Sequence, residues 1–178
     1  MNIFNKLRQR MSAGSTTGLV VASIYGIAVN GGPWQHSHNL VPSAGILDLL
    51  EVYIGAGSQT TGWHLAPFAG NVTPAPTWTA ANFDATATEF TNYVAASRPS
   101  LVPDTAAAGE INNLSSLASI TIGSGAQDTI WGVSLQSSAT KQGTSGVMFS
   151  ASRLGVARAN LAEGDQIQLS YRLQISNA

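Results

Sequence analysis

The feature that most constrains the fold is a ten-residue alternation near the C-terminal end of the sequence. Residues 166–175 read QIQLSYRLQI, so apolar or aromatic side chains alternate with Gln, Ser and Arg. Successive side chains of a strand point to opposite faces of a sheet. The alternation therefore predicts a half-buried antiparallel β-strand that begins after the turn formed by residues 163–165.

Shorter segments have the same strand character and are separated by Gly, Pro, Asn or Ser turns. NGGP at 30–33 is a strong turn, and residues 34–45 resemble a loop. Residues 46–55 combine helical and strand spacing, and their C-terminal half favours a strand. We predict further strands at 18–29, 61–68, 87–97, 117–122, 129–137 and 145–154. Many short strands indicate an all-β fold, an antiparallel β-sandwich of jelly-roll-like type.

The N-terminal region differs from this pattern. We predict an extended arm and connecting loop over residues 1–45 and the β-sandwich domain over residues 46–178. Residues 1–11 place Ile3, Phe4, Leu7 and Met11 near one face of a short helix, and residues 12–18 form a polar link. The bases Lys6, Arg8 and Arg10 lie in this arm, and no acid precedes Asp48.

A charged start before the apolar run 18–29 is also the pattern of a secretory signal peptide. However, the polar residues 12–18 separate the charges from the apolar run. The run is also too short to span a bilayer. We therefore favour an arm that packs in a multimer over an export signal, and we expect no membrane partner.

Charged residues make up only 10% of the chain, against about 25% in a typical soluble domain. The net charge is −1, so electrostatic repulsion protects the surface poorly against association. We expect the chain to bind copies of itself in an assembly. The absence of a basic excess argues against a specific nucleic-acid partner, and the absence of cysteine excludes disulfides and cysteine nucleophiles.

Several patterns in the sequence could carry chemistry. His36 and His38 share one face if they lie on a strand, and His64 or Asp48 could complete a zinc or copper site. A loop that makes hydrogen bonds or packs at an interface is the favoured interpretation of this pair. The chain has no G-x-S-x-G or phosphate-loop motif. We therefore expect no metal site and no cofactor.

Paired carboxylates could support glycoside hydrolysis. The available acids are Asp48, Glu51, Glu89, Glu163 and Asp165. The last two flank a turn glycine, where acids are expected for structural reasons, and Asp48 and Glu51 are expected to face solvent. We accordingly predict that the chain is not an enzyme.

Aromatic side chains could instead form a platform for sugars, which would make the chain a glycan-binding β-sandwich. Core or interface positions are the more frequent use of aromatics in β-domains. The candidates for the platform are Trp63, Trp78, Phe83, Phe90 and Tyr93.

The segment ATEFTNYVAASRP at 87–99 carries one acid and one base, Glu89 and Arg98. On a regular strand, Phe90 and Tyr93 fall on opposite faces, with one side chain in the core and one outward. Because charges are scarce in this chain, we expect Glu89 and Arg98 to make an intersubunit or turn-fixing contact rather than to act in acid–base chemistry.

The order of segments from Val52 to Ser176 resembles a family of small structural proteins from the virions of tailed bacteriophages. The resemblance covers about 125 of the 178 residues. It rests on VYIG at 52–55, TGWHLAPF at 61–68, VTPAPTWTAANF at 72–83, TEFTNYVAASRP at 88–99, LASITI at 117–122, IWGVSLQSS at 130–138, KQGTSGVMFSASRL at 141–154 and GDQIQLSYRLQIS at 164–176.

This resemblance implies a β-rich accessory protein on the capsid surface of the virion, without enzyme activity. Such a protein is a capsid decoration (cement) protein or a component of the head–tail neck or the tail. The implied partners are the major capsid protein, other virion proteins and further copies of the chain. We predict an assembly interface at Lys6, Arg8, Arg10, Trp34, Trp78, Glu89 and Arg98. We also expect the arm, residues 1–30, to reach a neighbouring subunit.

Overall fold

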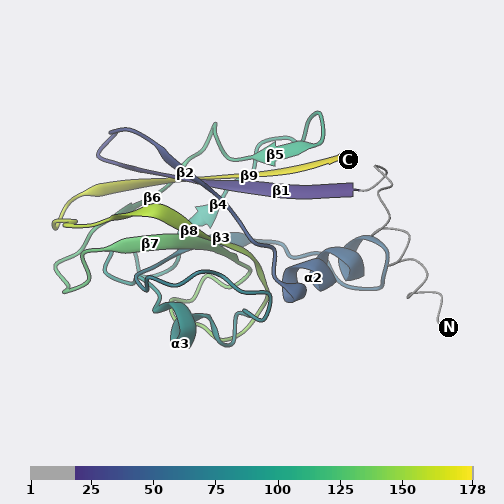
Figure 1. Cartoon of the computed structure of the whole chain (residues 1–178), viewed down its shortest axis with the longest axis horizontal. Coiled ribbons are helices and arrows are strands. Elements are labelled where there is room, and N and C mark those ends of the chain that lie inside the picture. Colours follow the sequence, from purple (N-terminus) through teal and green to yellow (C-terminus); the bar gives the residue numbers. More distant parts are fainter. Residues whose placement is uncertain (1–18, 178) are drawn as a thin grey trace.

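A computed structural model describes residues 19–177 as two antiparallel sheets that pack as the layers of a sandwich (Figure 1). This confirms the predicted all-β sandwich. The first sheet contains β1 (Leu19–Val29), β2 (Gln35–His38), β5 (Glu110–Asn112), β6 (Ala118–Thr121) and β9 (Gln166–Asn177). The second contains β3 (Trp63–Phe68), β4 (Ser100–Leu101), β7 (Ile130–Gln136) and β8 (Met148–Arg158). The helices are α2 (Ser43–Tyr53) and α3 (Phe83–Ala87).

The alternating segment at the C-terminal end forms β9, as predicted. This strand pairs with β1 along its whole length, from Leu19 opposite Asn177 to Val29 opposite Ile167. On its other side it pairs with β5 and β6. Its apolar positions Ile167, Leu169 and Tyr171 are buried, because the other sheet covers that face.

Strand β1 corrects the predicted domain boundary. Residues 19–38 do not form an arm or loop that precedes the sandwich, because β1 and β2 are integral strands of the first sheet. The side chains of Tyr25 and Ile27 on β1 are buried in the main core. The expectation that residues 1–30 reach a neighbour is therefore wrong for 19–29. Residues 1–18 lie outside the described part of the chain.

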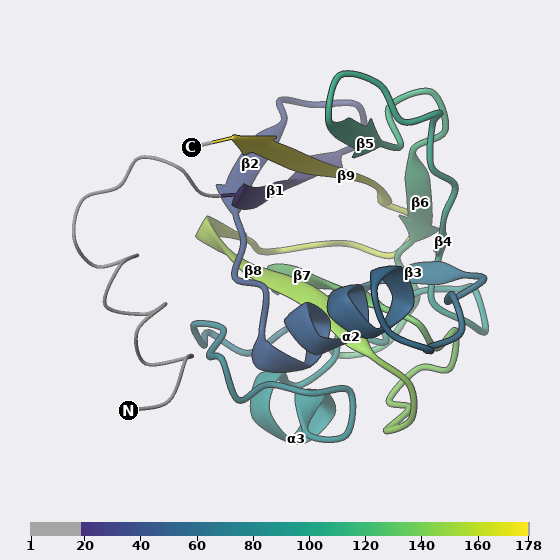
Figure 2. The same ribbon diagram turned by 90° about the vertical axis from the view of Figure 1, so that its right-hand side faces the viewer.

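The main core lies between the two sheets. Tyr25, Ile27 and Leu169 of the first sheet pack in one cluster with Leu65 and Val133 of the second. A smaller cluster lies on the opposite face of the second sheet, where Phe68 packs in edge-to-face geometry against Trp78 and Phe83. Helix α3 lies beside this face in both views (Figures 1 and 2). Because both faces of the second sheet are covered in this region, β7 and the first five residues of β8 (148–152) are almost entirely buried, uncharged and without alternation.

Helix α2 replaces the strand that we predicted for the C-terminal half of 46–55. Pro42 lies at its N-cap with extended backbone, and the N–H groups of Gly55 and Gly57 bond back to the carbonyls of Leu50 and Glu51. Gly45 faces β8 so closely that a Cβ atom there would overlap the backbone of Phe149. The helix lies across one end of the sandwich, the end at which β1 begins (Figures 1 and 2).

Candidate functional site

The predicted interface charges Glu89 and Arg98 are buried inside the chain and bind each other. Arg98 donates from Nε to Glu89 Oε1 at 2.8 Å and from Nη2 to Glu89 Oε2 at 2.7 Å. Its Nη1 donates to the carbonyl of Ser138, and the backbone N–H of Gln142 donates to Glu89 Oε2. The pair therefore fixes the loop 138–142. Of the two contacts that we predicted for Glu89 and Arg98, the turn-fixing contact describes this geometry, and the intersubunit contact is wrong.

The strand predicted over 87–97 is also wrong. Apart from isolated bridges at Glu89 and Tyr93, the segment is irregular and begins with the last residue of α3. Phe90 and Tyr93 are both buried, so neither side chain points outward as the strand geometry predicted. The ammonium group of Lys141 lies 3.5 Å from the centroid of the Tyr93 ring and donates to two backbone carbonyls of this segment. Burial raises the pKa of Tyr93 and lowers that of Lys141.

The alternative of an aromatic platform for sugars is wrong, whereas the favoured core position describes most of its candidate residues. Trp78 is only 3% exposed, and Phe83, Phe90 and Tyr93 are likewise buried, so they cannot stack on a sugar. Trp63 is half-buried between the sheets, where it packs edge-to-face against Phe149. The assignment of Trp78 to an assembly interface is wrong for the same reason.

Of the predicted interface residues, Trp34 remains on the surface. It stacks at 6.2 Å between ring centroids on His36, which shares one exposed face of β2 with His38. Across residues 19–177, no group of three or more His, Cys, Asp or Glu side chains could hold a metal ion. His64 lies on β3, next to Ser100. Lys6, Arg8 and Arg10 fall outside the described residues, so their part in an interface stays a prediction.

Asp165, in the turn before β9, has a structural role. The Asp165 carboxylate accepts from Asn30 Nδ2 and from the backbone N–H of Ala162, each at 2.8 Å. These bonds hold the pKa of Asp165 below its ordinary value. They join the turn after β1 to the turn before β9.

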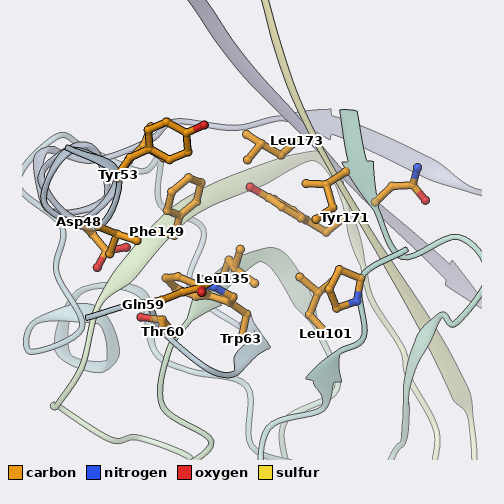
Figure 3. A pocket seen from close by; sticks show the side chains of 15 residues that line it. Asp48, Tyr53, Gln59, Thr60, Trp63, Leu101, Leu135, Phe149, Tyr171 and Leu173 are labelled. Carbon is orange, nitrogen blue, oxygen red and sulfur yellow. The ribbon is translucent and has the colours of Figure 1, made fainter. Parts of the chain in front are cut away.

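A cleft opens between the two sheets beside α2, and it is the site that sequence analysis missed. It encloses about 400 Å³, which lies within the range of about 300–1,000 Å³ for ligand sites. Figure 3 shows aromatic and aliphatic side chains from both sheets converging on it. They include Trp63, Leu101, Leu135, Phe149, Tyr171 and Leu173.

One side of the cleft is formed by α2, which contributes Leu49, Val52 and the acid Asp48. Asp48 is half-buried, and this burial raises the pKa of its carboxyl group. The prediction that Asp48 faces solvent is thus only partly correct, whereas Glu51 is exposed. None of the described residues that line the cleft is Lys, Arg or His. The cleft is therefore apolar with an acid at its edge.

The opposite side of α2 is also apolar but faces outward. Ile46, Leu47, Leu50 and Ile54 form an outer face of the helix, with exposed fractions of 50%, 59%, 55% and 79%. A surface helix ordinarily keeps one polar face. Here the charged side chain on the outer side is Glu51. Contiguous exposed apolar surface of this kind marks a site of interaction.

A sequence signal for α2 was present but was ambiguous. ILDLLEVYIG satisfied helical and strand spacing at once because apolar residues occupy almost every direction around the helix. A helix that is apolar all round is one that has partners on both sides. The inner side faces the cleft, and the outer side is exposed in the described chain.

Comparisons with known proteins add no assignment. No protein-family model matches the chain. No curated protein matches it at a significant level. Neither described helix is long and apolar enough to cross a membrane.

Proposed function

We propose that this chain is a structural protein of a tailed-bacteriophage virion that decorates the capsid and bridges neighbouring shell subunits. The observation that carries the proposal is the outer face of α2, Ile46, Leu47, Leu50 and Ile54, which needs a protein partner to cover it. The resemblance of residues 52–176 to small virion proteins supports the major capsid protein as that partner. A neck or tail component of the virion is the nearest variant.

The mechanism is mechanical. A decoration protein adds buried area across the joints between shell subunits, and burial of apolar surface is the dominant favourable term in association. The outer face of α2 supplies apolar anchors, and the weakly charged surface offers little electrostatic opposition to close packing. The buried Glu89–Arg98 pair and the turn at Asp165 join distant segments of the domain, which suits a mechanical role.

The test uses shells of the major capsid protein from the phage that encodes the chain, prepared without it. The purified chain should co-sediment with these shells and saturate at hundreds of copies per particle. The double variant Leu47→Gln/Leu50→Gln should bind at least about tenfold more weakly, because burying one Leu side chain contributes about 1.5–3 kcal/mol and about 1.4 kcal/mol corresponds to a tenfold change in affinity. Gln retains good helix propensity, so α2 should persist in this variant.

Val156→Gln is the matched control. Val156 is 71% exposed on β8, at the opposite end of that strand from the residues that contact α2. Its replacement should leave binding unchanged. Saturation at a few copies or tens of copies would assign the chain to the neck or tail, and a failure of the chain to co-sediment would refute the proposal.

A further inference from the structure

The cleft beside α2 is lined by apolar side chains and has the acid Asp48 at its edge. Residues 1–11, which precede β1 in the sequence, contain apolar and basic side chains. We propose that residues 1–11 occupy this cleft within the same polypeptide, with Phe4 and Leu7 directed into its apolar interior. The bases Lys6, Arg8 and Arg10 then lie near the acids of α2. The inference concerns the inner side of α2 and does not depend on the virion role proposed for its outer face.

The chemistry of the two partners is complementary. The cleft presents apolar side chains from both sheets, and its charged lining residue is Asp48. Glu51 follows one turn later on the same helix, and α2 itself carries no base. Residues 1–11 contain bases but no acid, and their apolar side chains recur at helical spacing. A cationic amphipathic segment is therefore the occupant that matches both the shape and the charge of the cleft.

The connection is long enough for this docking. Leu173, which lines the cleft, pairs with Ser23 of β1, and Leu19 lies four residues before Ser23 on the same strand. Four strand residues span about 13 Å. Residues 12–18 can extend over about 24 Å. The polar link 12–18 is therefore long enough to span the distance from Leu19 back to the cleft, so that residues 1–11 can reach it.

Docking within one polypeptide is favoured over exchange between copies. A short flexible linker that spans the distance gives an effective concentration in the millimolar range. If residues 1–11 of one molecule instead bound the cleft of another, that binding would depend on the concentration of free protein, which is much lower than this effective concentration. The described chain also begins at the end of the sandwich where α2 lies (Figures 1 and 2).

The absence of cysteine makes a cross-linking test simple, because any engineered pair is unique in the full chain. Phe4, Leu7 and Met11 are each changed to Cys and combined with Gln59→Cys at the edge of the cleft. Mild oxidation should give an intrachain disulfide in at least one of these three proteins, detected by mass spectrometry. The control pair, Leu7→Cys with Val156→Cys, should remain reduced. Interchain disulfides, or no disulfide in all three proteins, would overturn the proposal.

A second measurement reports directly on whether the cleft is filled. The neutral apolar dye Nile red should bind the unaltered chain weakly, because residues 1–11 already cover the cleft. In the variant Phe4→Ser/Leu7→Ser, dye emission should rise several-fold. The control variant Asn2→Ser/Asn5→Ser should behave like the unaltered chain. Equal dye binding by all three proteins would show that residues 1–11 do not fill the cleft.

Discussion

Glu89 and Arg98 form a two-point ion pair with fully buried side chains. Removing charges from water costs several kcal/mol per ion, which the pair recovers only when both partners are present. Here the remaining hydrogen-bonding capacity is used as well, by the carbonyl of Ser138 and the N–H of Gln142. The ion pair and these two hydrogen bonds therefore join residues 89–98 to the loop 138–142. Because both charges are buried, each of the two side chains needs the other to offset its loss of hydration.

We expect Arg98→Met and Glu89→Leu each to lower the free energy of unfolding by about 3–5 kcal/mol, because each leaves a buried charge unpaired. The double variant should lose less than the sum of the two by at least about 1 kcal/mol. Urea denaturation monitored by tryptophan fluorescence measures these values. Arg172→Met is the control, since the partly exposed pair Arg172–Glu110 should contribute less than about 1 kcal/mol. Equal losses for Arg98→Met and Arg172→Met would contradict the burial argument.

Asp165 provides a prediction about pH. Its folded-state pKa is depressed, chiefly by the hydrogen bond from Asn30, so the ionised form is favoured by folding. Its contribution to stability is therefore present above the ordinary pKa near 3.8 and is lost as the pH falls through the folded-state value. NMR titration of the Asp165 carboxyl should give a midpoint below 3.8, and Asn30→Ala should raise that midpoint. An unchanged midpoint in the variant would contradict the assigned cause.

Among the elements, α2 is held where it is by the close approach of Gly45 to the backbone of β8. Ala is a better helix former than Gly by about 1 kcal/mol. We nevertheless expect Gly45→Ala to lower the free energy of unfolding by about 1–3 kcal/mol, because the added methyl group overlaps Phe149. Gly155→Ala on β8 is the control. A Cβ atom at Gly155 meets open space, so the change should stay within about 0.5 kcal/mol. Stabilisation by Gly45→Ala would show that α2 is free to move.

The elements also show how far sequence reasoning extends. Strand β9 was predictable because its alternation is local and one of its faces is covered by the core. Strand β2 was missed because its four residues become a strand only through pairing with β1. Helix α2 was ambiguous because apolar residues surround it. Residues 87–97 were misassigned because Glu89 and Arg98 bind residues of the distant loop 138–142, and because Phe90 and Tyr93 pack in a core built from many segments. The cleft joins residues from seven elements and has no local signature.

At the scale of the whole molecule, two apolar surfaces meet at one end of the sandwich, the cleft and the outer face of α2. They share a helix but differ in what can cover them. The cleft is a cavity with Asp48 in its lining, which suits a basic segment of the chain itself, whereas the outer face is an exposed apolar surface, which suits a protein partner. A weakly charged surface tolerates close packing of subunits but does little to keep free molecules apart. These properties agree with the place in an assembly that we propose for the chain.

The boundary between arm and sandwich can be tested with two truncations. Removal of residues 1–17 should leave a cooperative unfolding transition, because β1 begins at Leu19 and the described core lies beyond it. Removal of residues 1–29 should abolish that transition, because β9 then loses its neighbour along eleven residues and the core loses Tyr25 and Ile27. Far-UV circular dichroism during thermal unfolding distinguishes the two proteins. The shorter truncation should in addition bind Nile red more strongly than the full chain, because the cleft is then uncovered. Cooperative unfolding of the protein without residues 1–29 would restore the original division at residue 45, since β1 would then be an appendage that the sandwich does not need.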